Sequence, residues 1–345
     1  MKKLLLLITT AVLIFCSCST EFNPNDEWRE TMVVYGILDQ DCDTTWIRVQ
    51  KCFLGEGNAY DYAHIIDSSC YAEDELEVKI VEWFAEKNRE GALQKTSQTG
   101  REFEFTYTVL DNKPEGTFFA PQQPIYYCCT KGKLYADIDR IYELRILNRK
   151  TGECVTSETS LIGSGIEVTK PDYRFQFNQG SPQNRTAIVK WKVDEGRVAR
   201  VFQAVVRFFY FEGTEGNMQL KYVDIEGSVL RNTSNSNYMQ STFTRTGFGA
   251  QLKEKIGPKP NDDIFREIVD SVQIYIYAGN ETLSNYMSVS APPTTIVQER
   301  PTFSNIDGGL GIFASRRTKI KIRIDTPKEI NNDYKIFLKQ LDLGF

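Results

Sequence analysis

The sequence predicts a mostly β fold built from two β-sandwich-like domains. Apolar and polar residues alternate with a period of two in many segments, most regularly in residues 101–110, where Phe103, Phe105 and Tyr107 alternate with glutamate and threonine. Turn-forming glycine, asparagine and aspartate separate these segments, and 12% of the residues are aromatic. Such alternation is typical of antiparallel strands that have one face on the core and the other in solvent.

Six strand-like segments precede residue 163, and we expect them to form an immunoglobulin- or fibronectin-like sandwich over residues 32–162. In one of them Leu76, Val78 and Ile80 alternate with charged residues. A turn-forming run at residues 148–152 separates the last two segments. The predicted strands are residues 32–38, 46–53, 76–84, 101–110, 142–146 and 154–161.

Residues 163–165, with the sequence Gly-Ser-Gly, are the predicted linker between the domains, because small flexible residues favour a break in regular structure. We expect a C-terminal antiparallel β domain over residues 166–345 with one or two short helices. Asn261 is a candidate cap for a helix at 264–269, and a second helix is predicted at 281–289. The predicted strands are residues 166–169, 173–177, 187–193, 201–211, 220–230, 272–277 and 316–325.

The N-terminus has the pattern of a bacterial lipoprotein signal. Lys2 and Lys3 precede an almost unbroken apolar stretch at 4–15, which is too short to span a bilayer. Because the small residue Ser17 precedes Cys18, we expect residues 1–17 to be removed and Cys18 to carry the lipid. Residues 18–31 then form an acidic tether. The alternative is an ordinary secretory signal with incidental cysteines.

The charge balance disfavours nucleic acid as a partner. The whole chain has a net charge of −5. Removal of Lys2 and Lys3 with the signal leaves 39 basic against 46 acidic residues, which is a net charge of −7 for the mature protein. A protein that neutralises phosphates normally presents a basic face, so the sequence predicts no nucleic-acid binding.

Apart from Cys16 and Cys18, the chain has six cysteines, and all of them lie before residue 155. This uneven distribution supports a division of the chain into two domains. In an exported protein, six cysteines indicate disulfides whose pairing the sequence does not specify. The alternative is that several stay reduced as small buried residues. These cysteines are Cys42, Cys52, Cys70, Cys128, Cys129 and Cys154.

The sequence predicts no cofactor, no metal site and no catalytic centre. His64 is the single histidine, no Cys-x-x-Cys pattern occurs, and the Gly-x-Ser-x-Gly nucleophile motif is absent. Asp39, Asp41 and Asp43 have the spacing of a calcium loop, but the glycine and the bidentate glutamate of such a loop are missing. We therefore interpret the aspartates as a polar turn.

Three phrases resemble an uncharacterised family of lipoproteins from the Bacteroidota. They lie at residues 35–38, 47–60 and 304–315, and the resemblance covers nearly the whole mature chain. Members of this family are two-domain β proteins whose genes often lie beside those of TonB-dependent receptors. The resemblance implies an accessory role at the outer membrane, with a TonB-dependent receptor as the partner, and it assigns no catalytic or binding residue.

The polar and aromatic loop at residues 55–69 is the candidate partner-contact surface, because long loops on a rigid scaffold often carry binding residues. A purely structural loop is the alternative. The candidate contact residues are Gly55, Glu56, Gly57, Asn58, Tyr60, Tyr62 and His64.

These observations favour a non-catalytic accessory or binding protein, lipid-anchored in the outer membrane at the cell surface or on its periplasmic face, that serves TonB-dependent uptake. A structural or adhesive surface lipoprotein is the alternative. A surface hydrolase with paired carboxylates is the third hypothesis, because such pairs need proximity in space and not in sequence.

We predict that Cys18→Ala abolishes lipid attachment, because the thiol of Cys18 is the expected acceptor. Intact-mass spectrometry of protein from the native host should show acyl chains on the wild-type protein and none on the variant. Cys16→Ala serves as the matched control and should keep the lipid. An unmodified thiol at Cys18 in the wild-type protein would contradict the prediction.

Overall fold

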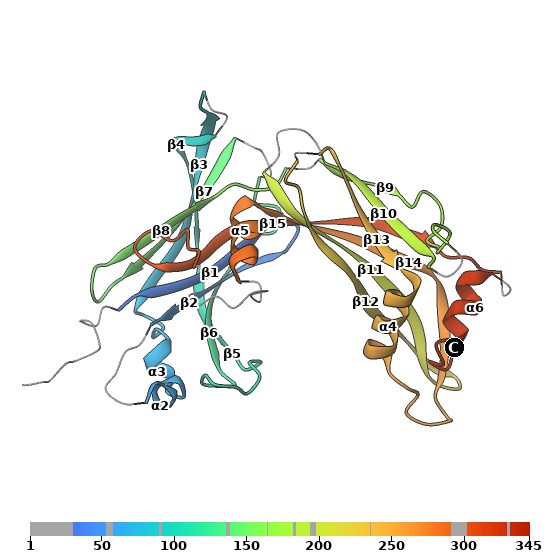
Figure 1. Cartoon of the computed structure of the whole chain (residues 1–345). Coiled ribbons are helices and arrows are strands. Elements are labelled where there is room, and N and C mark those ends of the chain that lie inside the picture. The colour runs from blue at the N-terminus through green and yellow to red at the C-terminus, as the bar shows by residue number, and fades with distance from the viewer. Residues whose placement is uncertain are drawn as a thin grey trace, which may run out of the picture.

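The computed structural model describes most of the chain and confirms the mostly β fold (Figure 1). Strands hold 53% of the described residues and helices hold 14%. The described residues are 30–52, 58–89, 92–135, 139–163, 165–181, 184–193, 198–234, 236–290, 302–329 and 332–345.

An eight-stranded sheet runs through both halves of the protein. Its strands come from the beginning, the middle and the end of the chain, so sequence order and spatial order differ. In spatial order they are β12 (Asn217–Arg231), β11 (Ala199–Thr214), β14 (Phe265–Asn280), β15 (Leu310–Asp325), β1 (Met32–Asp39), β2 (Thr44–Lys51), β6 (Gln123–Cys129) and β5 (Thr106–Leu110).

Two smaller sheets each pack on one half of this long sheet and enclose a separate hydrophobic core. The four-stranded sheet has the order β4 (Leu93–Glu104), β3 (Leu76–Lys87), β7 (Arg140–Asn148) and β8 (Cys154–Thr159). The three-stranded sheet has the order β13 (Tyr238–Thr244), β10 (Thr186–Val193) and β9 (Ile166–Lys170). Each core is therefore the interior of a two-layer sandwich.

Strand β15 belongs to both sandwiches. Its first half pairs in parallel with β1, from Leu310 opposite Val33 to Arg316 opposite Asp39. Its second half pairs in an antiparallel manner with β14, from Arg316 opposite Gly279 to Asp325 opposite Ser271. One continuous strand thus connects the two sandwiches.

The N-terminal core needs residues from near the end of the chain. Beyond the predicted domain 32–162, Ile306 and the fully buried Phe313 complete this core. Gly36 on β1 lies opposite Phe313, and a Cβ atom there would lie 3.1 Å from the phenyl ring. Gly311 has a φ of 110°, and a Cβ atom there would lie 2.0 Å from the carbonyl oxygen of Val34. Two of the family-like phrases, at 35–38 and 304–315, therefore pack together.

Five described helices supplement the sheets: α2 (Ala59–Ala63), α3 (Ile66–Ser69), α4 (Arg245–Ile256), α5 (Glu281–Ser290) and α6 (Asp333–Lys339). Helix α4 begins where the Thr244 side chain accepts a hydrogen bond from the Gly247 amide. Phe248 on α4 and Phe337 on α6 are buried in the C-terminal core. None of the described helices reaches the length and hydrophobicity that a membrane span requires.

Three predicted elements differ in the structure. The strand predicted at 101–110 is divided at Phe105, so that residues 101–104 belong to β4 of the four-stranded sheet and residues 106–110 form β5 of the eight-stranded sheet.

The other two predictions were wrong in the type of element. The predicted helix at 264–269 lies in strand β14, where the buried Arg266 pairs with Glu212 of β11 and its guanidinium also donates to the Leu343 carbonyl. The predicted strand at 173–177 is a loop with one isolated bridge, from Arg174 to Asp325. In both cases distant partners decide the backbone, and local pattern does not reveal them.

The predicted helix at 281–289 is confirmed as α5. The sequence pattern does not predict helices α2, α3, α4 and α6, strands β6 and β13, or residues 93–100 of β4. Two glycines within α4 lower its helix propensity, and packing of its buried face compensates for them.

We predict that Phe313→Ala lowers the free energy of unfolding by about 3–5 kcal/mol, because it leaves a cavity in the N-terminal core. Chemical denaturation of the purified protein measures this change. Phe265→Ala is the matched control, since the Phe265 side chain is 51% exposed, and it should cost less than about 1 kcal/mol. Equal losses in the two variants would contradict the shared-strand arrangement.

Candidate functional site

The predicted sites lie partly outside the described residues. Cys18, Gly55, Glu56 and Gly57 fall among residues 1–29 and 53–57, which the structure does not describe. The described remainder of the loop consists of α2 and α3. The Asn58 side chain accepts a hydrogen bond from the Tyr60 amide and so begins α2.

The described part of the loop lies at the surface. Tyr60 is 65% exposed and His64, at the end of α2, is also exposed, whereas Tyr62 is half-buried. The connection between β5 and β6 lies beside α2, because the Phe119 amide donates to the Ala63 carbonyl. The neighbouring residue, Phe118, is exposed and lies in this segment beside the loop. We define the α2–α3 patch as Tyr60, Ile65 and Phe118, which are 65%, 50% and 48% exposed.

The cysteines form no disulfide among the described residues. Cys42, Cys52, Cys129 and Cys154 are exposed, and Cys70 and Cys128 are half-buried. The adjacent pair at 128–129 ends strand β6 and lies opposite Thr45 and Thr44 of β2. Burial raises the pKa of the Cys128 thiol, so this thiol stays protonated at neutral pH.

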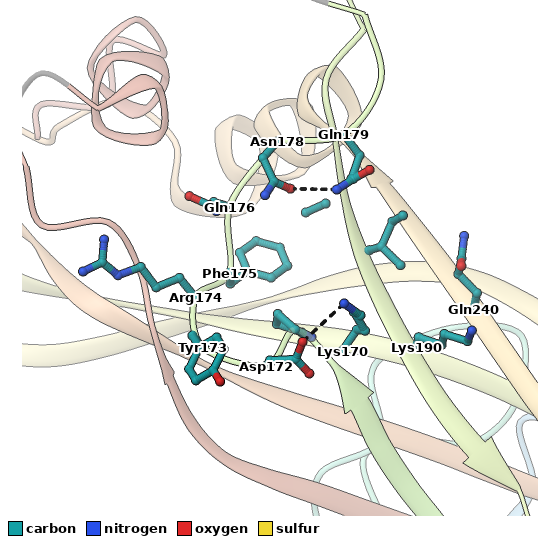
Figure 2. A pocket seen from close by; sticks show the side chains of 13 residues that line it. Lys170, Asp172, Tyr173, Arg174, Phe175, Gln176, Asn178, Gln179, Lys190 and Gln240 are labelled. Atoms are coloured by element: carbon teal, nitrogen blue, oxygen red, sulfur yellow. Dashed lines mark hydrogen bonds and ion pairs between the residues drawn. The ribbon is translucent and has the colours of Figure 1, made fainter.

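A second surface is a pocket on the outside of the three-stranded sheet (Figure 2). Its volume is about 470 Å³, which is within the range of ligand sites. Strand β10 and the loop 171–179 supply most of its lining, and β13 adds Gln240. We call it the β9–β10 pocket. Its polar lining residues are Lys170, Asp172, Tyr173, Arg174, Gln176, Asn178, Gln179, Lys190 and Gln240.

The local sequence explains how the pocket forms. Pro171 lacks an amide hydrogen and follows the last residue of β9, so the chain leaves the sheet at this point. The loop is then attached to the C-terminal core by Phe175 and Phe177, which are buried and contact Phe248 of α4. This attachment fixes the backbone that carries the polar side chains of the pocket.

The pocket carries an excess of positive charge. Lys170 pairs with Asp172 at 3.2 Å, and Arg174 pairs with Glu329 at 3.3 Å. The ammonium group of Lys190 lies 4.9 Å from the centre of the Tyr238 ring. No carboxylate of the described residues lies within 4.0 Å of Lys190, so this cation is available to an anionic ligand.

The rim of the pocket carries an exposed aromatic ring. Tyr173 is 86% exposed, which is unusual for so large a side chain, and it lies between Asp172 and Arg174 (Figure 2). A tyrosine ring offers a rigid apolar face together with a polar tip. Ile188 adds an apolar side chain to the lining. The pocket therefore combines cations, amides and an apolar surface.

The sequence pattern predicts a strand at 173–177 and therefore gives no indication of a pocket there. The local sequence Lys-Pro-Asp-Tyr-Arg at 170–174 carried a signal for a turn. Lys190 and Gln240 are distant in sequence, and only the pairing of β10 with β9 and β13 brings them to the same surface.

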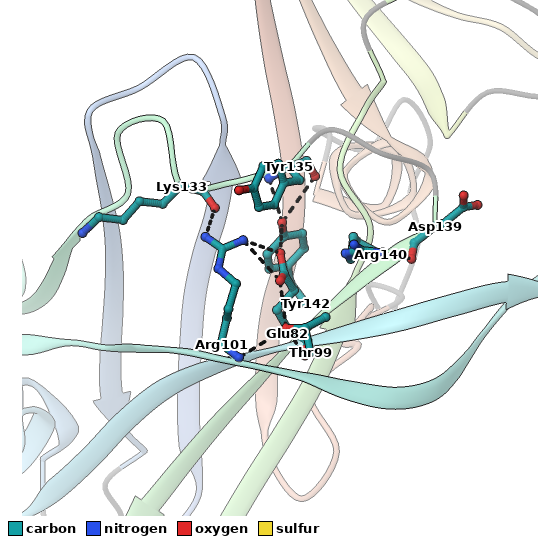
Figure 3. A network of polar contacts seen from close by, with 8 residues as sticks. All are labelled: Glu82, Thr99, Arg101, Lys133, Tyr135, Asp139, Arg140 and Tyr142. Atoms are coloured by element: carbon teal, nitrogen blue, oxygen red, sulfur yellow. Dashed lines mark hydrogen bonds and ion pairs between the residues drawn. The ribbon is translucent and has the colours of Figure 1, made fainter.

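A buried polar network in the N-terminal sandwich is structural rather than catalytic (Figure 3). The Glu82 carboxylate, on β3, is 1% exposed. It accepts hydrogen bonds from the Thr99 hydroxyl at 2.8 Å, the Tyr142 hydroxyl at 2.9 Å and the Arg101 guanidinium at 3.1 Å. Burial raises the pKa of Tyr142, so its hydroxyl remains a donor. The buried carboxylate therefore accepts from three side chains, which is the arrangement expected of a structural charge in a core.

The described residues show neither a cluster of metal-ligating side chains nor a histidine paired with a carboxylate or nucleophile. Nowhere in the described part of the chain do three or more His, Cys, Asp or Glu residues gather in a way that could hold a metal ion. The exposed His64 has no carboxylate within 4.0 Å among the described residues, and none of the nucleophiles described there hydrogen-bonds to it.

Comparisons with known proteins add little. No family model matches the chain, and no curated protein matches it. A solved DUF4785 family protein from Legionella pneumophila has a TM-score of 0.21 and 10% identity, and the match covers 70% of this chain. This chain matches about half (51%) of the length of that protein. A second structure, CBD12 from CALX1.2, has a TM-score of 0.16 and 8% identity, with 77% of this chain and 90% of that chain covered. Likenesses at this level support no functional assignment.

We predict that Glu82→Gln lowers the free energy of unfolding by about 2–4 kcal/mol, because an amide cannot accept from Arg101, Thr99 and Tyr142 together. Urea denaturation measures the change. Glu102→Gln is the matched control, since Glu102 forms an exposed pair with Lys79 at 3.7 Å, and it should cost less than about 1 kcal/mol. A neutral effect of Glu82→Gln would exclude the structural role.

Proposed function

We propose that the protein is a lipid-anchored binding protein of the outer membrane that acts beside a TonB-dependent receptor and performs no catalysis. The β9–β10 pocket is the observation that carries the binding role. It combines an available cation, several amides and an exposed tyrosine ring around a volume of about 470 Å³. These groups recognise a ligand through hydrogen bonds and charge, and they include no nucleophile with an adjacent base.

Anchoring rests on the sequence pattern around Cys18. The tether that follows has a root-mean-square reach of roughly 20 Å for thirteen residues. The described fold begins at Glu30, and the Cys52 amide donates to the Thr31 carbonyl, so the tether joins the N-terminal sandwich. In this proposal the N-terminal sandwich lies nearest to the membrane.

The α2–α3 patch is the proposed receptor contact. Cys52 leads toward α2, so the patch and the tether belong to the same sandwich. Exposed apolar side chains that lie close together mark interaction sites more often than isolated ones do. A division of roles follows, in which the N-terminal sandwich contacts the receptor and the C-terminal sandwich holds the ligand.

We predict that the double substitution Tyr60→Ser and Ile65→Ser abolishes co-purification of a barrel receptor, because it removes the apolar contact at the patch. The measurement is a pull-down from outer membranes in mild detergent, with the lipid anchor intact, followed by mass spectrometry.

Tyr222→Ser is the matched control for this pull-down. Tyr222 is 55% exposed but lies on β12 of the C-terminal sandwich, so its substitution should leave the complex intact. Absence of any barrel protein from the wild-type pull-down, with matrix material in its place, would favour the structural or adhesive alternative.

A further inference from the structure

We propose that the β9–β10 pocket binds an acidic sugar, a pyranose chain that carries carboxylate groups. This inference rests on the proposed binding function and names its ligand class. Three features of the pocket favour such a ligand: a cation without a carboxylate partner, a set of amides, and an exposed tyrosine ring.

The first feature is the charge. Lys190 lies on β10, the central strand of its sheet, and is half-buried, so its position is fixed by the strand. Its contact within the protein is the ring of Tyr238, which leaves the ammonium group free to donate hydrogen bonds. Lys170 is paired with Asp172 and Arg174 with Glu329, so Lys190 supplies the net positive charge of the pocket. A ligand with a negative group therefore gains a charge-assisted hydrogen bond.

The second feature is the amides. Asn178, Gln179 and Gln240 line the pocket with amides that each offer a donor and an acceptor, whereas the Gln176 side chain points away from β10 (Figure 2). Gln179 and Asn178 share one hydrogen bond of 3.5 Å, so most of their capacity is unused (Figure 2). Paired donors and acceptors suit hydroxyl groups, which both donate and accept. A simple carboxylic acid or an aliphatic anion lacks the hydroxyl groups that would replace water at these exposed amides.

The third feature is the tyrosine ring. The faces of a pyranose ring carry C–H groups, and they pack on a flat apolar surface while the hydroxyls point outward. Tyr173 offers such a surface at the rim, and its 86% exposure leaves the ring face accessible. In the proposed pose one sugar ring rests on Tyr173 at the rim, and the sugar chain extends across the pocket toward Lys190 and Gln240 on the opposite side (Figure 2).

The test is isothermal titration calorimetry on the lipidated mature protein in detergent micelles, with trigalacturonate as the probe. Two further probes separate the parts of the proposal. The trimethyl ester of the same sugar removes the charge and keeps the rings, whereas citrate supplies carboxylates without a sugar. We expect trigalacturonate to bind at least tenfold more tightly than either.

The variants assign the binding to the pocket. Lys190→Met should weaken the binding of trigalacturonate at least tenfold and should reduce its dependence on salt. Lys192→Met is the matched control, because Lys192 lies on the same face of β10 but does not line the pocket. Tyr173→Ala should weaken the binding of both trigalacturonate and its trimethyl ester, because the substitution removes the aromatic surface for the sugar ring and leaves the charge of the pocket unchanged.

Several results would overturn the inference: no binding of trigalacturonate, equal binding of citrate or of the ester, or equal losses in Lys190→Met and Lys192→Met. Circular dichroism of each variant shows whether the fold is intact. The receptor pull-down distinguishes this inference from the proposed function. An intact receptor complex without sugar binding would refute the ligand class alone, and sugar binding without a receptor would refute the uptake role alone.

Discussion

The pairing of β15 with both β1 and β14 is the constraint on which the rest of the structure depends. The strand changes partners at Arg316, which lies opposite Asp39 on one side and Gly279 on the other. The Arg316 guanidinium donates to the nearly buried Asp39 carboxylate at 2.9 Å, so an ion pair joins the two strands at this position. Neither sandwich is complete without this strand, so neither core can close until residues 310–325 have joined the sheet.

The C-terminal sandwich provides a rigid base for the candidate ligand site. Its core contains many aromatic rings, and the loop 171–179 contributes Phe175 and Phe177 to it. Phe177 stacks against Tyr334 of α6 with ring centres 6.0 Å apart, which ties the loop to the last helix. A loop attached in this way can hold polar side chains in fixed positions, and fixed positions reduce the entropy that a ligand must overcome. The missed helices α4 and α6 thus support the pocket from the core side.

We propose that the membrane, the receptor and the ligand each contact a different part of the molecule. The lipid and its tether lie at the N-terminus, the α2–α3 patch belongs to the N-terminal sandwich, and the β9–β10 pocket belongs to the C-terminal one. The buried Glu82 network and the Arg266 pair with Glu212 satisfy charges inside the two sandwiches. These two ion-pair networks explain why charged residues occur within strands that are otherwise apolar on the buried face. A structural role is sufficient to account for those residues.

The sequence by itself determined the mostly β class and most strand positions, because alternation with a period of two depends only on neighbouring residues. Tertiary structure alone decided that Arg266 lies in a strand and that residues 173–177 form a loop, since those outcomes depend on Glu212 and on a core built by distant segments. The same holds for the pocket. Lys190 meets the loop 171–179 only because β10 pairs with β9, and such pairing over distance leaves no trace in a local pattern.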